Sequence, residues 1–370
     1  MSLTKHKRVI ISGGGTGGHI FPAISIANAL RKLAPGTEIL FVGAEGRMEM
    51  EKIPAAGYRI IGLPVTGIHR NLTLKNIKVL IKLFKSLYLA RKVIREFDPD
   101  VVVGVGGYAS GPVLRQAGKM GIPTLIQEQN SYAGITNRLL AKKASTICVA
   151  YEGMEKYFPA KKIIKTGNPV RQNFDNLKKL QTEALSFFNL KKGFPVILVL
   201  GGSLGAGSIN NSLSGNINML RDSDCQWLWQ TGKHYFENIK ALVSVTFNEN
   251  ISVHGFINRM DYAYAVADII VSRAGACTIS ELCLVGKPVI LIPSPNVAED
   301  HQTKNAMALS EMEAAVLITD DHAIKNLVNV AINLVSDKTK RDKLSENILK
   351  MADRDADVRI AQEVLKLSVK

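Results

Sequence analysis

The chain has 370 residues, 46% of them hydrophobic and 21% charged, which is typical of a folded globular protein and excludes a disordered one. Its length suits two domains of ordinary size, and no apolar run approaches the roughly 18 residues that a membrane-spanning helix needs. The four cysteines are scattered without a CxxC pair, which argues against a disulfide framework or a zinc site and fits a reducing cytoplasm.

The net charge of +15 lies in the first half of the chain. Residues 1–170 hold 25 Lys and Arg against 10 Asp and Glu, whereas residues 171–370 hold 22 of each. This asymmetry indicates that the first half meets something anionic, namely nucleic acid, a phospholipid surface or a phosphorylated substrate. The alternative is a solubility charge without a partner.

Short apolar runs alternate with helical patterns along the chain, which favours a parallel α/β architecture. In the first half we expect strands over residues 8–12, 38–42, 101–105, 124–128 and 146–149. In the second half we expect them over residues 196–200, 226–230, 251–254, 269–272 and 289–292. A long helix is expected over residues 73–97, and the stretch after residue 350 is also helical in pattern.

Both halves open with a strand, a glycine turn and an amphipathic helix, in KRVIISGGGTGGHIFPAISIANAL and FPVILVLGGSLGAGSINNSL. We therefore predict two Rossmann-like domains, residues 1–168 and 169–349, with parallel sheets facing a cleft. The C-terminal helix, residues 350–370, is expected to pack back on the first domain.

The first glycine turn fits GxGxxG through Gly13, Gly15 and Gly18, a pattern that brings backbone amides and a helix N-terminus to a phosphate. A dinucleotide site would also need an acidic residue at the end of the second strand, to hold a ribose. That strand ends FVGAEGR, with Glu45 only in the loop beyond it, so the pattern disfavours a dehydrogenase.

Four further glycine-rich turns follow expected strands: VGVGGYASGP, EQNSYAG, LGGSLGAGS and SRAGACTISE. Ligands of open α/β sheets bind beyond the carboxyl ends of the strands. One such turn alone is explained by a tight connection between strand and helix. Five together indicate a ligand cleft.

The motifs GGGTGGHIFPA, VGVGGYASGP, QEQNSYAG, TGNPVR, GGSLGA, GFINRM, SRAGACTISEL and EDHQTKNA occur in this order along nearly the whole chain. In this combination the chain resembles the MurG family of peptidoglycan N-acetylglucosaminyltransferases. The resemblance implies a GT-B fold and an inverting transfer of N-acetylglucosamine from UDP-N-acetylglucosamine to the muramyl 4-hydroxyl of lipid I, the undecaprenyl-diphosphate-linked muramyl pentapeptide. It also implies lipid II and UDP as products, and peripheral attachment to the cytoplasmic face of the inner membrane.

By the same resemblance, Glu281 would accept both ribose hydroxyls, Ile257 would border the uracil with its backbone, and Gln302 would read the sugar ring. Each has a structural alternative, such as a carboxylate favoured by the helix dipole or a helix-cap residue. Arg171 would reach the donor or serve as an exposed hinge residue. The full set expected to bind UDP-N-acetylglucosamine is Thr16, Gly17, Gly18, Asn130, Arg171, Ser203, Ile257, Ala276, Cys277, Thr278, Ile279, Ser280, Glu281 and Gln302.

Stabilisation of the leaving diphosphate requires either a divalent metal or oriented dipoles. The two DxD sequences, residues 98–100 and 222–224, lie in turns away from the carboxyl ends of the strands. Ser203 and the amides of residues 202–205 instead open a helix whose positive end suits a diphosphate. We therefore expect no metal site and no cofactor.

The acceptor side rests on two residues. His19 ends the first glycine loop at a helix start, where it could accept the proton of the attacking hydroxyl or donate to a phosphate. The helix dipole is expected to lower its pKa and to favour the neutral form. Tyr108, in GGYASGP, lies where the family handles the lipid-linked acceptor.

The helix expected over residues 73–97 carries more apolar surface than a core face needs. Its predicted core stripe is Leu80, Leu83, Leu87, Ala90, Ile94 and Phe97. A second stripe consists of Ile77, Ile81, Phe84 and Tyr88, flanked by Lys78, Lys82, Lys85 and Lys92. Contact with a neighbouring loop or helix is one explanation. The hypothesis is an interfacial patch on an anionic membrane, with Lys142 and Lys143 extending its basic rim.

Two other functions compete. A UDP-N-acetylglucosamine 2-epimerase shares the two-domain architecture but would be expected to bring several carboxylates to the cleft, whereas these loops offer Glu281 and few others. A nucleic-acid-binding protein would suit the pI of about 9.6. With 6% aromatic residues and no nucleic-acid motif, that reading leaves the glycine loops unexplained, so no nucleic-acid partner is expected.

Overall fold

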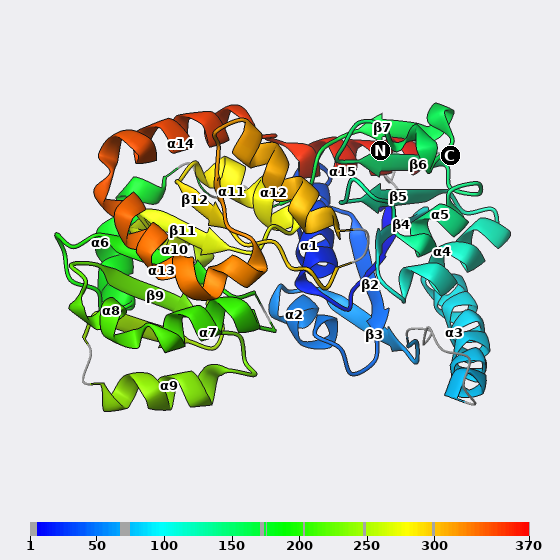
Figure 1. Ribbon diagram of the computed structural model, residues 1–370. Helices are drawn as coiled ribbons and strands as arrows, with labels where there is room; N and C mark the ends of the chain where they lie inside the picture. Colours follow the sequence, from blue (N-terminus) through cyan, green and yellow to red (C-terminus); the bar gives the residue numbers. More distant parts are fainter. Residues whose placement is uncertain are drawn as a thin grey trace. The chain divides into compact units, whose positions relative to one another are not determined.

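The computed structural model describes residues 6–66, 75–170, 174, 176–202, 204–246, 249–297 and 300–369, and only the backbone of residues 75–78 and 80. The chain divides into two compact units (Figure 1). The first consists of Met1–Arg171 with Asp355–Lys370, and the second of Gln172–Arg354.

The first unit contains a seven-stranded parallel sheet in the order β3-β2-β1-β4-β5-β6-β7. Its strands are β1 (Arg8–Gly13), β2 (Glu38–Ala44), β3 (Arg59–Leu63), β4 (Val101–Gly106), β5 (Thr124–Glu128), β6 (Thr146–Val149) and β7 (Ile163–Lys165). The strand order reverses between β1 and β4, and such a switch point is where open α/β sheets bind ligands.

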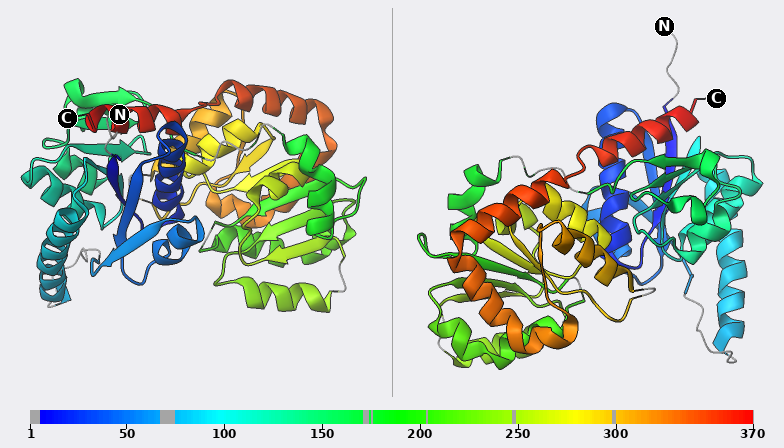
Figure 2. Two further views of the ribbon diagram at one scale, coloured as in Figure 1. Left: turned by 180° about the vertical axis from the view of Figure 1, so that it is seen from behind. Right: turned by 45° about the horizontal axis from the view of Figure 1, so that its top comes forward.

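The helices of the first unit form two layers. They are α1 (Gly17–Leu33), α2 (Glu49–Ala55), α3 (Lys75–Phe97), α4 (Ser110–Lys119), α5 (Ile135–Leu140) and α15 (Ala356–Leu367), with short 3-10 helices at Met154–Lys156 and Ala160–Lys162. Successive residues of β1 alternate between the layers, with Val9 and Ile11 in the cluster of α1 and Ile10 in that of α3, α4 and α5. The C-terminal helix α15 lies beside α1 (Figure 2).

The second unit contains a six-stranded parallel sheet in the order β10-β9-β8-β11-β12-β13, with its switch point between β8 and β11. Its strands are β8 (Val196–Leu200), β9 (Gln226–Gln230), β10 (Ile251–His254), β11 (Ile269–Ser272), β12 (Val289–Leu291) and β13 (Val316–Leu317). Its helices are α6 (Leu177–Phe187), α7 (Gly207–Gly215), α8 (Ile217–Asp222), α9 (Phe236–Val245), α10 (Met260–Val266), α11 (Ala276–Val285), α12 (His301–Glu311), α13 (Asp320–Ser336) and α14 (Lys338–Lys350).

The predicted fold class, two Rossmann-like domains with parallel sheets, is confirmed. All ten expected strands are present, and the sequence analysis missed β3, β7 and β13. Each of these three lies at the edge of its sheet, where a strand is covered less and needs fewer apolar residues.

The predicted core stripe of α3 is wrong at Leu83, which is 37% exposed. Among the α3 side chains that the structure describes, the buried ones are Ser86, Ala90, Val93 and Ile94. The earlier part of α3 runs past the end of the sheet (Figure 1). The side chains of Leu80 and of the predicted patch residues Ile77 and Lys78 lie outside the described residues. No helix of the described residues is long and apolar enough to cross a bilayer.

Candidate active site

At the switch point of the first sheet, the glycine loops after β1 and β4 touch. Gly107 has a φ of +84°, and a Cβ atom there would lie 2.3 Å from the carbonyl oxygen of Gly14. Only glycine permits both the left-handed conformation and this approach. Of the predicted donor residues, Thr16 is the extended N-cap of α1, which begins at Gly17 and continues through Gly18.

His19 lies in the first turn of α1, against the backbone at the end of β4. A Cβ atom on Gly106 would lie 2.7 Å from its Cδ2, and its Nδ1 is 3.4 Å from the Thr16 hydroxyl. The pKa of His19 is lowered, as expected, but the main cause is burial of the imidazole, and the charges of Glu128 and Glu49 oppose it. The neutral ring is therefore favoured near neutral pH.

Glu49, on α2, braces the first glycine loop and was missed by the sequence analysis. It is fully buried, and its carboxylate accepts hydrogen bonds from the N–H groups of Gly15 (2.9 Å) and Ala44 (3.0 Å). A Cβ atom on Gly14 would collide with it at 2.1 Å. The carboxylate of Glu49, five residues after the end of β2, thus binds backbone N–H groups of the protein itself. No spacing in the sequence announces this contact, because the bonded residues Gly15 and Glu49 are 34 positions apart.

Glu128, at the end of β5, organises the next loop in the same way. Its buried carboxylate accepts from the backbone N–H groups of Asn130 (3.1 Å) and Gly134 (3.0 Å) and from the side-chain amide of Asn137 (2.8 Å). The side-chain amide of Asn130 also donates to it, at 3.3 Å. The predicted donor residue Asn130 is therefore oriented by Glu128, for which the sequence predicted no role.

Tyr108 follows the glycine pair of β4 and is exposed. The turn beneath it is fixed by Ser110, whose hydroxyl lies within hydrogen-bond distance of the carbonyl oxygens of Ser12 (2.7 Å) and Gly106 (2.8 Å). Tyr108 is thus presented to the surface beside the β1–β4 switch point by a rigid turn.

The second sheet repeats the arrangement at its own switch point. Gly205, in the loop after β8, has a φ of +91°, and a Cβ atom there would lie 2.5 Å from the ring of Tyr235. A Cβ atom on Gly232 would lie 2.2 Å from the Gly205 nitrogen, so this loop rests on neutral groups. Leu204 at its tip is exposed, and the predicted residue Ser203 lies outside the described residues, as does Arg171.

The helix after β11 carries the predicted nucleotide-binding run, residues 276–281. The side chains of Ala276 and Ile279 are buried. Cys277, Thr278 and Ser280 are half-buried, and the hydroxyl of Ser280 donates to the Ala276 carbonyl oxygen at 3.1 Å. A nucleotide contact by residues 276–281 stays a prediction.

Glu281 and Ile257 both have partners within the chain. The hydroxyl of Tyr264 donates to the Glu281 carboxylate at 2.7 Å, which fixes one of its oxygens. The backbone N–H of the buried Ile257 donates to the side chain of Gln230 at 2.9 Å. A base at Ile257 would therefore meet its carbonyl group or compete with Gln230, a residue that the sequence analysis did not consider.

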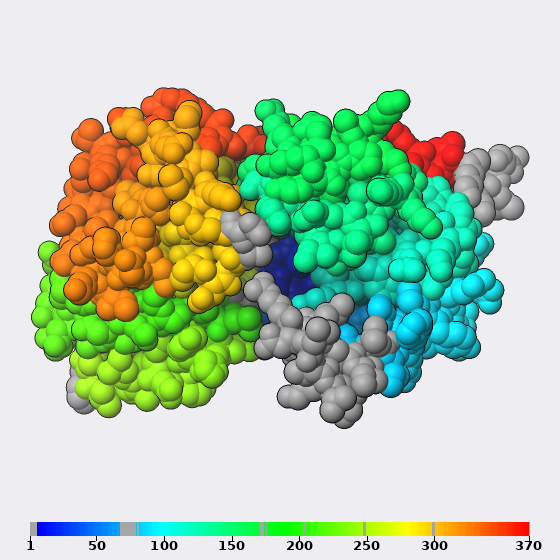
Figure 3. All heavy atoms as spheres, turned by 45° about the vertical axis from the view of Figure 1, so that its right-hand side comes forward, coloured from blue at the N-terminus to red at the C-terminus, as the bar shows by residue number. Residues whose placement is uncertain are grey.

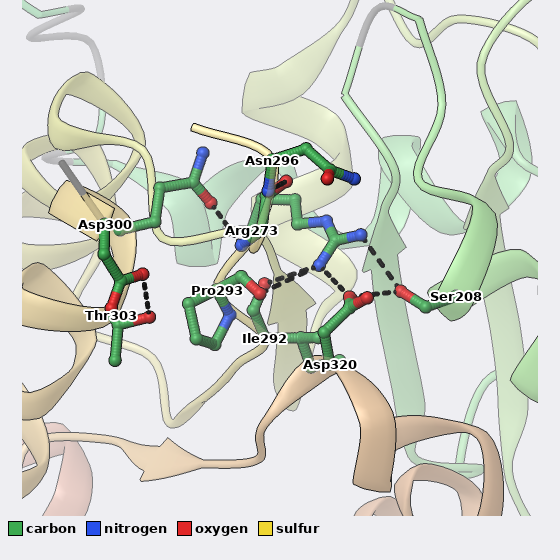
Figure 4. Close-up of polar contacts among 10 residues, drawn as sticks. Ser208, Arg273, Ile292, Pro293, Asn296, Asp300, Thr303 and Asp320 are labelled. Carbon is green, nitrogen blue, oxygen red and sulfur yellow. Dashed lines mark hydrogen bonds and ion pairs between the residues drawn. The ribbon is translucent and has the colours of Figure 1, made fainter. Parts of the chain in front are cut away.

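Gln302 lies in the first turn of α12, and its side-chain oxygen accepts from the backbone N–H of Ser294 at 2.9 Å. Its neighbour Thr303 uses its hydroxyl locally, as a donor to Asp300 at 2.6 Å. Close by, Arg273 donates to carbonyl oxygens at the end of β12 and pairs with the carboxylate of Asp320 (Figure 4). The sequence predicted no role for Arg273.

The predicted membrane stripe is exposed where its side chains are described: Ile81, Phe84 at 70% and Tyr88, with Lys82, Lys85 and Lys92 beside them. The sequence analysis missed a second exposed apolar pair, Ile135 and Leu139, spaced four residues apart on α5. Figure 3 shows α3 in light blue to cyan, and the segments that follow it in cyan to green, at the surface of the first unit.

In the described part of the chain, no group of three or more His, Cys, Asp or Glu residues is placed to hold a metal ion. The first unit offers an imidazole with a lowered pKa and the backbone amides of a glycine loop. The second unit offers a glycine loop, the carboxylate of Glu281 on α11 and the side-chain amide of Gln302 in the first turn of α12. Such groups suit a polar ligand that carries phosphates and hydroxyls.

Comparisons with known proteins agree on one family. Residues 9–149 match the N-terminal domain of glycosyltransferase family 28, and residues 196–360 match its C-terminal domain. A UDP-N-acetylglucosamine–N-acetylmuramyl-(pentapeptide) pyrophosphoryl-undecaprenol N-acetylglucosamine transferase of Parabacteroides distasonis is 58% identical, over 97% of this chain and 98% of its own.

Solved structures agree as well. The crystal structure of MurG from Acinetobacter baumannii is similar with a TM-score of 0.72 and 28% identity, covering 97% of this chain and 99% of that one. A UDP-GlcNAc 2-epimerase from Neisseria meningitidis, bound to UDP-GlcNAc, shares the fold alone, with a TM-score of 0.67, 16% identity and coverage of 97% and 100%. The chain therefore belongs to the MurG family of glycosyltransferases, within glycosyltransferase family 28.

Proposed function

We propose that this glycosyltransferase transfers N-acetylglucosamine from UDP-N-acetylglucosamine to the muramyl 4-hydroxyl of lipid I, giving lipid II and UDP for peptidoglycan synthesis. The observation that carries the proposal is that each sheet places two glycine-rich loops at its own switch point, after β1 and β4 and after β8 and β11. The name of the Parabacteroides relative supports the identity of both substrates.

The second unit binds the donor in this proposal. Glu281, whose carboxylate also accepts from the hydroxyl of Tyr264, accepts the ribose hydroxyls. The uracil lies at Ile257, and Gln302 reads the sugar. The diphosphate meets the amides of residues 202–205 and the positive N-terminus of α7, together with Arg171, so that neither metal nor cofactor is required. From the first unit, Asn130 and the amides of Thr16, Gly17 and Gly18 complete the donor contacts.

The first unit handles the acceptor. The reaction forms a bond from the muramyl O4 to C1 of N-acetylglucosamine while the bond from C1 to the diphosphate breaks, and its electron pair leaves with UDP. The proton of the 4-hydroxyl must pass to a base. We assign this role to His19, because its lowered pKa keeps the imidazole neutral and the adjacent Glu128 and Glu49 stabilise the imidazolium that forms. Tyr108 lies beside this acceptor.

The first unit also meets the membrane in this proposal, at the cytoplasmic face. Phe84 on α3 and Leu139 on α5 belong to apolar stripes on helices that both pack against α4. Basic side chains are exposed on α3, α4 and α5 and just after α5, namely Lys82, Lys85, Arg115, Lys119, Arg138, Lys142 and Lys143. Apolar groups entering the headgroup region within a basic rim give reversible binding to anionic lipid. An acceptor that carries a polyprenyl chain stays in the same bilayer.

Release of UDP on addition of lipid I tests the proposed reaction. We expect release from UDP-N-acetylglucosamine only when lipid I is present, with lipid II as the second product. An epimerase would interconvert UDP-sugars without an acceptor, and a nucleic-acid-binding protein would do neither. Either of these results would contradict the proposal.

A further inference from the structure

Arg273, the first residue after β11, joins three elements of the second unit. Its side chain is 19% exposed. One terminal nitrogen, Nη1, donates to the carbonyl oxygens of Ile292 (3.1 Å) and Pro293 (3.2 Å) at the end of β12. The same nitrogen pairs with the carboxylate of Asp320 at the start of α13, and Nη2 donates to the hydroxyl of Ser208 on α7 at 3.0 Å.

The cluster is closed on itself, as Figure 4 shows. The hydroxyl of Ser208 donates to Asp320, so the carboxylate holds both the arginine and the serine. A planar guanidinium that meets several acceptors at fixed angles loses little rotamer freedom per bond and keeps its partners in register. Arg273 therefore fixes the carbonyl groups of residues 292 and 293 relative to α7 and α13.

The segment that Arg273 holds is linked to Gln302 by a hydrogen bond. Pro293 is followed by Ser294, whose backbone N–H donates to the side-chain oxygen of Gln302 at 2.9 Å. Because the N–H group can only donate, Gln302 must present its oxygen there, and its NH2 group is the one that can donate to a ligand. The hydroxyl of Ser294 in turn accepts from the N–H of Asn296 at 3.4 Å, within the same turn.

We infer that Arg273 is a positioning residue for recognition of the transferred sugar. By holding the end of β12 it sets the place of Ser294, and thereby the direction in which Gln302 donates to a sugar hydroxyl. Its guanidinium does not touch the donor. This inference rests on the proposed function, in which Gln302 reads N-acetylglucosamine, and it separates sugar recognition from the grip on the nucleotide, which lies at α11.

A double-mutant cycle on binding tests the inference. The dissociation constants of UDP and of UDP-N-acetylglucosamine are measured by calorimetry for wild type, Arg273→Gln, Gln302→Ala and the double variant. We expect Arg273→Gln to raise the dissociation constant of UDP-N-acetylglucosamine about tenfold, which corresponds to the loss of one hydrogen bond to the sugar. The dissociation constant of UDP should change less than about twofold. In the Gln302→Ala background, Arg273→Gln should add nothing further for UDP-N-acetylglucosamine.

Two variants act as references. Arg221→Gln removes an exposed arginine of the same unit that pairs with Asp222, and it should change neither constant. Arg273→Lys keeps the charge but cannot serve all the acceptors, so it should show a smaller loss of the same kind. If Arg273→Gln does not fold, the lysine variant carries the cycle.

An equal loss for UDP and UDP-N-acetylglucosamine would show that Arg273 supports the whole unit and would overturn the inference. Additive losses in the double variant would show that it does not act through Gln302. Both results leave the proposed function standing if the wild type transfers sugar to lipid I. A third result would contradict the proposed function alone. In that case the binding cycle gives the expected values, but the wild type releases no UDP when lipid I is added.

Discussion

The glycine loops that follow β1 and β8 both contain glycines with positive φ that lie close to neighbouring groups, but different residues support them. The first is braced by the buried carboxylate of Glu49, with Glu128 nearby, whereas the second rests on the ring of Tyr235 and the backbone of Gly232. A fixed negative charge behind a loop repels a second anion and stabilises a nearby imidazolium. A neutral support leaves the loop amides free of that repulsion. The first support suits proton transfer, and the second suits a diphosphate.

The strongest test of this contrast is His19→Ala in the first unit. Loss of a general base lowers turnover by about 10²–10⁴-fold. Because the proposed donor contacts do not include the His19 side chain, the dissociation constant of UDP should stay near that of wild type. Steady-state kinetics with lipid I and calorimetry with UDP measure the two quantities. Turnover equal to wild type would exclude His19 as the base, and a loss of donor affinity alone would make it a phosphate contact.

The pH profile of the wild type sharpens the same point. The pKa of His19 is lowered from its ordinary value of 6.5, so the ring is protonated, and turnover falls, only when the pH drops below that value. The contribution to stability has the same sign: it is present above the unfolded pKa and is lost as the pH falls through the folded one. This acid limb should be missing from the residual activity of His19→Ala.

Removing the charged support should cost less than removing the base. Glu49→Ala leaves the buried N–H group of Ala44 and the part-buried N–H group of Gly15 without their acceptor, at about 1–3 kcal/mol for the buried group and less for the other. We expect faster hydrogen exchange across residues 13–19, measured by mass spectrometry. Tyr235→Phe keeps the ring that supports the second loop, and should leave exchange across residues 204–210 within about 0.5 kcal/mol of wild type. Unchanged exchange in Glu49→Ala would show that Glu49 does not stabilise the loop after β1.

Glu281→Ala tests the second unit alone. Loss of a charged acceptor for the ribose should weaken UDP binding by about 1–3 kcal/mol, while the pH profile of turnover at saturating donor keeps its acid limb. Calorimetry with UDP gives the first quantity and initial rates the second. Tyr264→Phe, which removes only the hydroxyl that fixes Glu281, should lie between wild type and Glu281→Ala. UDP affinity equal to wild type in Glu281→Ala would refute the ribose contact.

The smallest effect concerns the charge difference between the halves. Replacement of Ile81 and Phe84 by Ser should reduce co-sedimentation with anionic vesicles by several-fold and leave UDP binding intact, with weaker binding of both proteins at high salt. Val245→Ser with Ile324→Ser removes two exposed apolar residues from the second unit and should sediment like wild type. If the α3 variant also sediments like wild type, this helix is not the anchor.

The central strands and the glycine loops could be predicted because each has a signal in a short stretch of the sequence. A buried parallel strand reads as an apolar run, and a loop after it that must approach another backbone reads as glycine. The contacts that hold the first glycine loop and the end of β12 could not be predicted, because Glu49 meets Gly15 and Arg273 meets Asp320 across long separations in sequence. Leu83 was misplaced because periodicity gives the face of a helix but not where along its length the packing begins.

The C-terminal helix α15 has a consequence for synthesis of the chain. Ile360, Ala361 and Val364 are fully buried against α1, and Arg359 donates to the carbonyl oxygen of Thr166 at 2.7 Å, so the first unit is completed by a helix that follows the whole second unit in the chain. A ribosome delivers the whole second unit before it delivers this helix. One apolar side of α1 therefore waits uncovered while about half of the protein is translated, and a nascent chain that stalls before residue 355 exposes a surface that chaperones bind.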